Sequence, residues 1–223
     1  MSGMEIEARN LATDTVLYKN SQTRKEKYFR LAGGFTGSGS GTWGNATGGA
    51  NLVTSITNGS GSSTFKHGNT KLDLGNGEFL DAGVENVLEF TPTDFTDAPP
   101  NTWFELGNLN LLNGTTFYNS EAETVTLTLN IGLTDPVEAA VVHIDLGLIS
   151  TDNSSDRLAS ADIVELRNPS TDFTLVIEGV TYRLELSWVT LDPGAGVVQG
   201  NQFLVFEGAS AQAQLRARFV SDQ

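Results

Sequence analysis

The sequence predicts an all-β protein, an antiparallel β-sandwich of jelly-roll-like type. The first indication is Glu123–Leu133, where aliphatic residues alternate with polar ones. A period of two sends one row of side chains into a core and the other into water. The second indication is the regular recurrence of such short runs, separated by turns rich in Gly and Asn. The third is that no long stretch shows helical periodicity.

The first half of the chain contains short strands separated by loops. One strand is expected within Asp14–Lys19. Residues 33–49 have a loop composition that fits two interpretations, a flexible linker or a short strand at Thr42-Trp43. Further strands are expected at Leu52–Ile56, Ser63–Phe65, Lys71–Leu74 and Val87–Phe90. Three prolines between 92 and 100 then indicate a loop.

The second half has longer and more regular alternation. Trp103–Leu112 and Glu123–Leu133 lie on either side of the turn Asn113-Gly114 and a polar segment. Further strands are expected at Val137–Ile149, Asp162–Leu166, Asp172–Glu178, Thr181–Val189, Gln202–Phe206 and Ala211–Val220. The last four are expected to pair as two hairpins, about Gly179 and about Glu207-Gly208. The alanines after Ala209 alternate with Gln and Arg, which indicates a strand and not a helix.

Length and composition favour one sandwich domain at 31–223, preceded by an extension or assembly arm at 1–30. The chain has 223 residues, of which 39% are hydrophobic, enough for a sizeable core. It contains no cysteine, so disulfides are excluded. No apolar run is long enough to span a membrane as a helix, and the first residues lack the apolar core of a signal peptide.

Charge is distributed unevenly. The formal net charge is −14, which disfavours nucleic acid as a partner. Residues 1–30 carry six of the 13 basic and four of the 27 acidic side chains, so the arm is +2 and the remainder is −16. Two interpretations remain open. The arm is a solvated terminal segment, or it docks on the acidic body of a neighbouring subunit.

Several segments together resemble the choice-of-anchor K domain of cyanobacterial and other bacterial surface proteins. They are Gly41-Thr42-Trp43 with 45–49, Phe104–Leu109 with Asn113-Gly114-Thr115, Ala159–Asp162, Glu178–Tyr182 and Phe206–Ala211. No single motif is very specific, but their order and spacing extend from about residue 33 to 219.

This resemblance implies an all-β sandwich of an exported surface protein, without enzymatic activity. The chain departs from the family pattern in two ways, because it shows no leader and ends at 217–223 without a sorting tail. The expected location is therefore extracellular or at a cell surface, with a phage virion or other particle as the alternative.

The best candidate for a metal site is a calcium site in one loop. Asp152, Asn153 and Asp156 lie close together in the sequence, and Asp162 follows soon after. Ca²⁺ prefers six to eight oxygen ligands from carboxylates, amides and carbonyls. The alternative is that these residues only form turns, for which Asp and Asn are well suited. No other cofactor is expected.

Two tryptophans form a candidate glycan site. Trp43 and Trp103 could offer a stacking platform, although aromatic residues in alternating strands more often belong to a core. Trp188 is in phase with aliphatic neighbours and is expected to be buried. His143 and Asp145 share one strand face, where a polar pair in solvent is favoured over a metal or proton-transfer site.

The sequence contains no recognisable catalytic arrangement, since no nucleophile elbow, triad or zinc spacing is present. We therefore expect a non-catalytic structural or adhesive β-sandwich protein of an extracellular or particle-surface assembly. Its partners would be protein components of that assembly, including copies of itself, with no membrane insertion. The alternative is a carbohydrate-binding module, with or without dependence on calcium.

Overall fold

The computed structural model describes residues 5–10, 15–19, 34–135, 137–177 and 179–221, and these residues form β-strands and loops without a helix. Every strand ladder is antiparallel, which confirms the predicted fold class. The strands are β1 Glu5–Asn10, β2 Thr15–Lys19, β3 Phe35–Gly48, β4 Thr54–Asn58, β5 Ser63–His67, β6 Lys71–Gly75, β7 Glu78–Asp81, β8 Asn86–Pro92, β9 Phe95–Ala98, β10 Phe104–Leu112, β11 Ala122–Asp135, β12 Val137–Ile149, β13 Asp162–Leu166, β14 Ser170–Ile177, β15 Val180–Thr190, β16 Gly196–Gln199, β17 Gln202–Val205 and β18 Ser210–Ser221.

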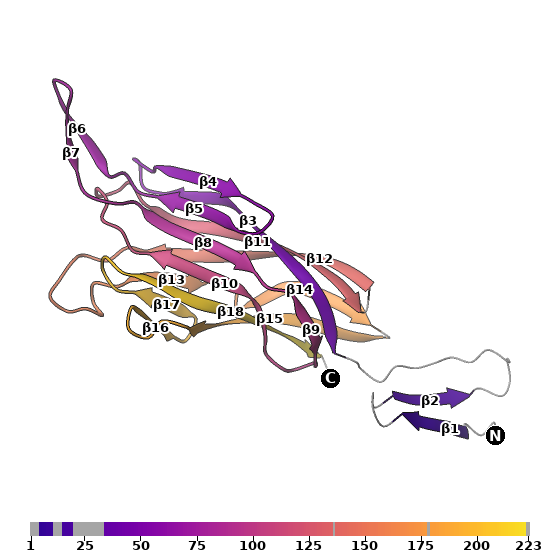
Figure 1. The fold of residues 1–223 in the computed structure, drawn as a ribbon. Coiled ribbons are helices and arrows are strands. Elements are labelled where there is room, and N and C mark those ends of the chain that lie inside the picture. Colours follow the sequence, from indigo (N-terminus) through magenta and orange to yellow (C-terminus); the bar gives the residue numbers. More distant parts are fainter. Residues whose placement is uncertain (1–4, 11–14, 20–33, 136, 178, 222–223) are drawn as a thin grey trace.

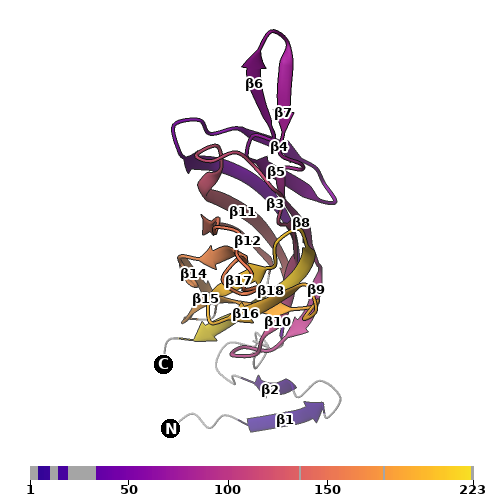
Figure 2. The ribbon, with the colours of Figure 1, turned by 90° about the vertical axis from the view of Figure 1, so that its left-hand side faces the viewer.

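Two seven-stranded sheets pack face to face and curl around a common core (Figures 1 and 2). One sheet has the strand order β14-β15-β18-β10-β8-β5-β4, and the other β16-β17-β13-β12-β11-β3-β9. Two separate two-stranded sheets are formed by β1 with β2 and by β6 with β7. None of the described residues forms a helix that is long and apolar enough to cross a membrane.

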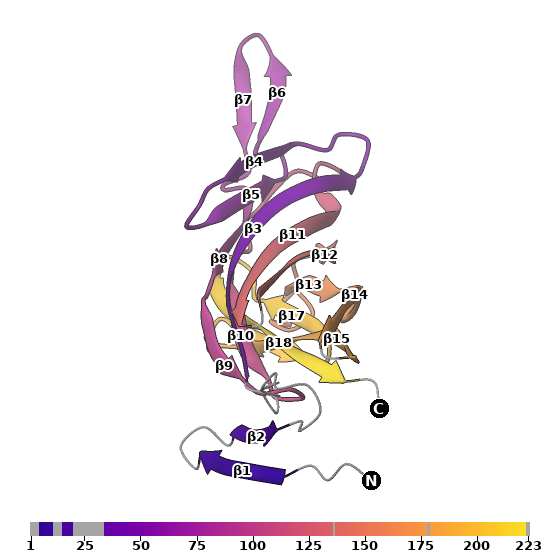
Figure 3. The ribbon, with the colours of Figure 1, turned by 90° about the vertical axis from the view of Figure 1, so that its right-hand side faces the viewer.

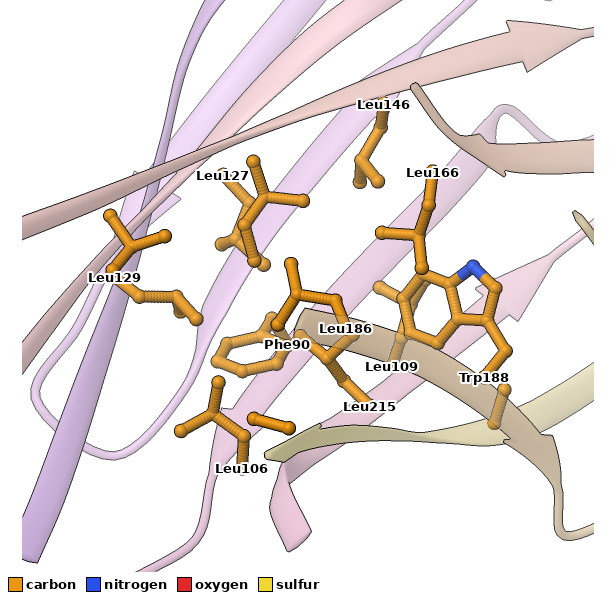
Figure 4. Packing of buried hydrophobic residues seen from close by; sticks show 14 of the residues in the cluster. Phe90, Leu106, Leu109, Leu127, Leu129, Leu146, Leu166, Leu186, Trp188 and Leu215 are labelled. Carbon is orange, nitrogen blue, oxygen red and sulfur yellow. The ribbon is translucent and has the colours of Figure 1, made fainter. Parts of the chain in front are cut away.

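The core is built from the alternating rows that the sequence predicts. In β11 the inward row is Val125, Leu127, Leu129, Ile131 and Leu133, all of them buried. Leucines of β11, β12 and β13 meet Phe90, Leu109, Leu186 and Leu215 of the opposite sheet (Figure 4). Trp188 is also buried in this core, as its phase predicts.

Residues 33–49 differ from both sequence-based interpretations, because most of them form the long strand β3. Phe35 and Trp43 point into the core, and the small residues between them suit close approach of the opposite sheet. A Cβ on Gly41 would lie only 2.5 Å from Cδ1 of Phe90. The glycines that resemble a linker are therefore packing positions.

The predicted hairpin about Glu207-Gly208 is wrong. β17 pairs with β13 and β16, whereas β18 pairs with β10 and β15 in the other sheet. The turn therefore carries the chain from one layer to the other. The hairpin about Gly179 is confirmed, because β14 pairs with β15 on either side of it. Strands β7, β9 and β16 were not expected from the sequence, nor was β1.

Leu129→Asp should lower the free energy of unfolding by several kcal/mol, because it places an unpaired charge in an apolar interior. Leu129 is only 2% exposed. The measurement is chemical denaturation followed by circular dichroism. Asn130→Asp is the matched control, since Asn130 is the exposed neighbour on the same strand. Equal midpoints for Leu129→Asp and the parent would contradict the assigned phase of β11.

Candidate functional site

A polar cavity of about 620 Å³ lies where three connections between strands meet. Its walls come from residues 113–123 between β10 and β11, residues 148–153 at the end of β12, and Glu207 in the turn between β17 and β18. Gly49, Asp162 and Arg167 complete the lining. The β10–β11 and β17–β18 connections cross from one sheet to the other, whereas β12 and β13 are neighbours in the same sheet.

Asn113 anchors the floor of this cavity. Its backbone N–H donates to the carbonyl of Ala209, and its side-chain Nδ2 donates to the carbonyl of Val205 at 3.0 Å. The following residue, Gly114, approaches the backbone so closely that a Cβ would lie 2.2 Å from the oxygen of Val84. Asn113 is buried, and its Oδ1 has no hydrogen-bond partner among the described residues. A buried amide oxygen without a partner is energetically costly.

Two glutamates link the connections around the cavity. Glu207 Oε1 accepts hydrogen bonds from Thr115 Oγ1 and Asn153 Nδ2, both at 3.1 Å. It therefore ties the β10–β11 connection to the β12–β13 connection. Glu121 Oε1 accepts from Asn86 Nδ2 at 3.0 Å and from Thr116 Oγ1 at 2.5 Å.

The cavity is strongly acidic. Its lining includes five carboxylates, Glu121, Glu123, Asp152, Asp162 and Glu207, against the single guanidinium of Arg167. Burial, helped by the negative charges of Glu121 and Glu207, raises the pKa of Asp162 from 3.8 to about 7. The backbone N–H of Thr151 donates to Asp162 Oδ1 at 3.0 Å and opposes this shift. Such a cavity attracts cations and groups that donate hydrogen bonds.

His67 lies behind the cavity wall and stays neutral. Burial lowers its pKa to about 4, although the carboxylate of Glu121 acts in the opposite direction. Its Nδ1 accepts a hydrogen bond from the N–H of Ala122 at 3.2 Å, and its ring stacks on Phe65. His67 therefore fixes the start of β11, a structural role.

The structure brings together three of the four residues of the predicted calcium site. Asp152, Asn153 and Asp162 line the cavity. Asp156 lies outside the lining, and its Oδ1 accepts from the N–H groups of Leu158 and Ala159, so it stabilises its own turn. In the described part of the chain, no three His, Cys, Asp or Glu side chains are grouped closely enough to hold a metal ion. Calcium binding stays a prediction.

The two tryptophans of the predicted glycan platform occupy different environments. Trp43 is 4% exposed, and its Nε1 donates to the carbonyl of Ser63, so its ring belongs to the core and offers no open face. Trp103 is partly exposed and packs under the guanidinium groups of Arg216 and Arg218. The two indoles therefore do not form a common exposed surface.

His143 and Asp145 lie on a solvent-exposed face of β12. Thr128 Oγ1 and His143 Nδ1 are 3.1 Å apart, and Thr126 Oγ1 donates to Asp145 at 3.3 Å. Each side chain is thus engaged with the neighbouring strand, as the simpler interpretation of this pair predicts.

The sequence did not identify Asn113, Tyr118, Glu121 or Glu207 as cavity residues. Tyr118 is 95% exposed in the lining of the cavity. Asn113-Gly114 and Glu207-Gly208 were recognised as turns, and this was the only signal available. That these two turns meet at one cavity depends on which strands belong to which sheet, and the sequence does not show this.

Neither protein-family models nor curated proteins gave a match to this chain. The resemblance to the choice-of-anchor K domain therefore stays a prediction, and the function has to be argued from the structure.

Asp162→Asn should stabilise the protein increasingly as the pH rises from 5 to 8. The carboxyl loses its proton near pH 3.8 in the unfolded chain and near pH 7 in the fold. Its contribution to stability is therefore complete below 3.8 and is lost as the pH rises to 7, by at most about 1.4 kcal/mol per pH unit. Asparagine has no such dependence and keeps an oxygen to accept from Thr151.

The measurement is the difference in Tm between Asp162→Asn and the parent at pH 5 and pH 8. Glu138→Gln, an exposed carboxyl outside the cavity, is the control. A difference in Tm for Asp162→Asn that does not change with pH would show that this carboxyl is not desolvated in the fold.

Proposed function

We propose that this chain is a non-catalytic structural or adhesive β-sandwich protein of an extracellular or particle-surface assembly, on a cell surface or in a virion. The observation that carries the proposal is the separation of charge between an arm of +2 and a body of −16. Opposite charges on two parts of one chain favour contact between copies, because each copy offers the complement of the next.

The role of the polar residues supports a structural function. The most buried ones hold connections in place, as His67 does for β11 and Asn113 for the crossing after β10. Glu121 and Glu207 accept hydrogen bonds that tie loops together. A rigid sandwich with such fixed connections is suited to present surfaces to partners.

The arm supplies a strand-forming segment outside the two large sheets. β2 pairs with β1 in its own two-stranded sheet, and not with an edge strand of the sandwich. Among the described strands, β2 therefore does not form the first strand of its own sandwich. Contact of the arm with a neighbouring subunit remains part of the proposal.

Deletion of residues 1–26 should leave a folded domain that no longer self-associates. The physical reason is that the basic side chains that neutralise a neighbour's acidic body are removed. Light scattering coupled to size-exclusion chromatography measures the association, and circular dichroism confirms the fold. Association of the intact chain should weaken between 50 mM and 500 mM NaCl, because salt screens exposed charges. Unchanged association after the deletion would refute the role of the arm.

A second candidate function is glycan binding, with calcium, at the acidic cavity. The observation that favours it is an exposed aromatic ring, Tyr118, in the lining of a cavity that also contains five carboxylates. Sugars bind where an aromatic face and convergent polar groups lie together. In this second function the glycan site would be the acidic cavity and not the surface at Trp43 and Trp103.

Glycan-array screening with and without EDTA tests this second function. If the cavity binds glycans, Tyr118→Ala should abolish the signal and Trp103→Ala should retain it. Asp152→Asn should abolish the part of the signal that EDTA removes, since it takes away a charged oxygen ligand. The absence of any reproducible glycan signal from the folded parent would exclude the second function.

A further inference from the structure

A two-stranded hairpin projects from one end of the sandwich. β6 and β7 are joined by a tight turn at Asn76-Gly77, where both residues have positive φ angles of 60° and 81°. Asn-Gly favours this turn because both residues tolerate the left-handed region. Every residue of the two strands is exposed, and the views show the hairpin standing clear of both sheets (Figures 1, 2 and 3).

The hairpin exposes large apolar side chains without a core beneath them. Leu72 is 45% exposed, Leu74 56%, Phe79 60% and Leu80 50%. A single two-stranded hairpin is marginally stable in water, and contiguous exposed apolar residues mark sites of protein contact. The hairpin is therefore an unoccupied contact surface in the single chain.

The charge of the hairpin is complementary to the arm. Asp73, Glu78 and Asp81 outnumber Lys71, so the hairpin carries a formal charge of −2, whereas residues 1–30 carry +2. The arm also contains aliphatic residues in its sequence, among them Ile6, Val16 and Leu17. The arm therefore offers apolar side chains that can pack against the hairpin, and a net charge opposite to that of the hairpin.

The arm and the hairpin belong to opposite ends of the body. The arm joins the body at Gly34, whose N–H donates to Asp97 Oδ1 at 2.9 Å beside the start of β3 and strand β9. Figures 1 and 3 show this end of β3 and β9 far from the hairpin. A contact between the two surfaces in different copies would therefore join the copies head to tail.

We propose that the β6–β7 hairpin docks on the N-terminal arm of a second copy of this chain. The inference rests on the proposed role in assembly and names the surface that accepts the arm. The contact joins two different surfaces, so repeated docking from copy to copy generates rings or open filaments. Exposed backbone along both hairpin strands adds hydrogen bonds to the apolar and ionic contacts.

Sedimentation velocity of the full chain over a concentration series tests the contact. The hairpin double variant Phe79→Ser, Leu80→Ser and the single variant Glu78→Lys should each weaken association at least tenfold. Val176→Ser is the matched control, because Val176 is 62% exposed on edge strand β14 and should have no effect. All four substituted positions are exposed, and thermal melting verifies that each variant folds.

Mixing two full-length variants distinguishes head-to-tail docking from pairing of two hairpins. The hairpin double variant retains its arm, and an arm variant with Lys25→Glu and Lys27→Glu retains its hairpin. Each alone should be monomeric, and the mixture should form a 1:1 pair, because one complete contact is restored. A mixture that stays monomeric would overturn the proposal. An arm variant that still self-associates on its own would also overturn it, in favour of pairing between two hairpins.

The remaining outcomes separate this inference from the proposed function. A parent chain that stays monomeric at all concentrations would contradict both the proposed self-assembly and the hairpin contact. A parent that assembles equally well with and without the hairpin substitutions would leave self-assembly standing and overturn the hairpin as its docking surface.

Discussion

The structure depends on the burial of two inner sheet faces against each other, and Phe90 packs where glycines let the backbone approach closely. Phe90 lies on β8 and is fully buried (Figure 4). A Cβ on Gly41 of β3 would lie 2.5 Å from its ring, and a Cβ on Gly107 of β10 would lie 2.4 Å from it. The ring therefore fills space that glycines of both sheets leave open, and a larger residue at Gly41, in the facing sheet, would push the layers apart.

This packing explains how much of the fold could be predicted. Strands β11, β12 and β18 have uninterrupted period-two alternation, so their inward residues were assigned correctly from Val125 to Leu133 and from Ala211 to Phe219. β3 was missed because Gly37, Gly39 and Gly41 have no side chain to show a period. The turn at Glu207-Gly208 was assigned to a hairpin, because the sequence does not show whether a turn stays in one sheet or crosses to the other.

The sequence predicts only those residues of the candidate site that are close to one another along the chain. Asp152, Asn153 and Asp162 were selected as neighbours in sequence, and they do line one cavity. Glu121 and Glu207 reach the same cavity from distant connections, which only the tertiary structure reveals. Burial then determines their electrostatics. Asp162 and His67 both favour the neutral form, so their contributions to stability change in opposite directions with pH.

The molecule thus separates two kinds of surface. Near the cavity, polar groups are tied down by hydrogen bonds between connections, whereas the β6–β7 hairpin exposes leucines and a phenylalanine that no described residue covers. Large apolar side chains are exposed to water in the hairpin, whereas most of those in the body are buried. That contrast is the physical basis for proposing the hairpin, and not the connections around the cavity, as a surface that contacts other subunits.

Hydrogen exchange followed by mass spectrometry, in dilute and in concentrated protein, tests this account most directly. Amides of β11 and β18 should be protected under both conditions, because they are central strands with partners on both sides. Amides of β6 and β7 should exchange rapidly in dilute protein and become protected on assembly, together with those of the arm. Protection that appears on assembly elsewhere, while β6 and β7 continue to exchange rapidly, would contradict it.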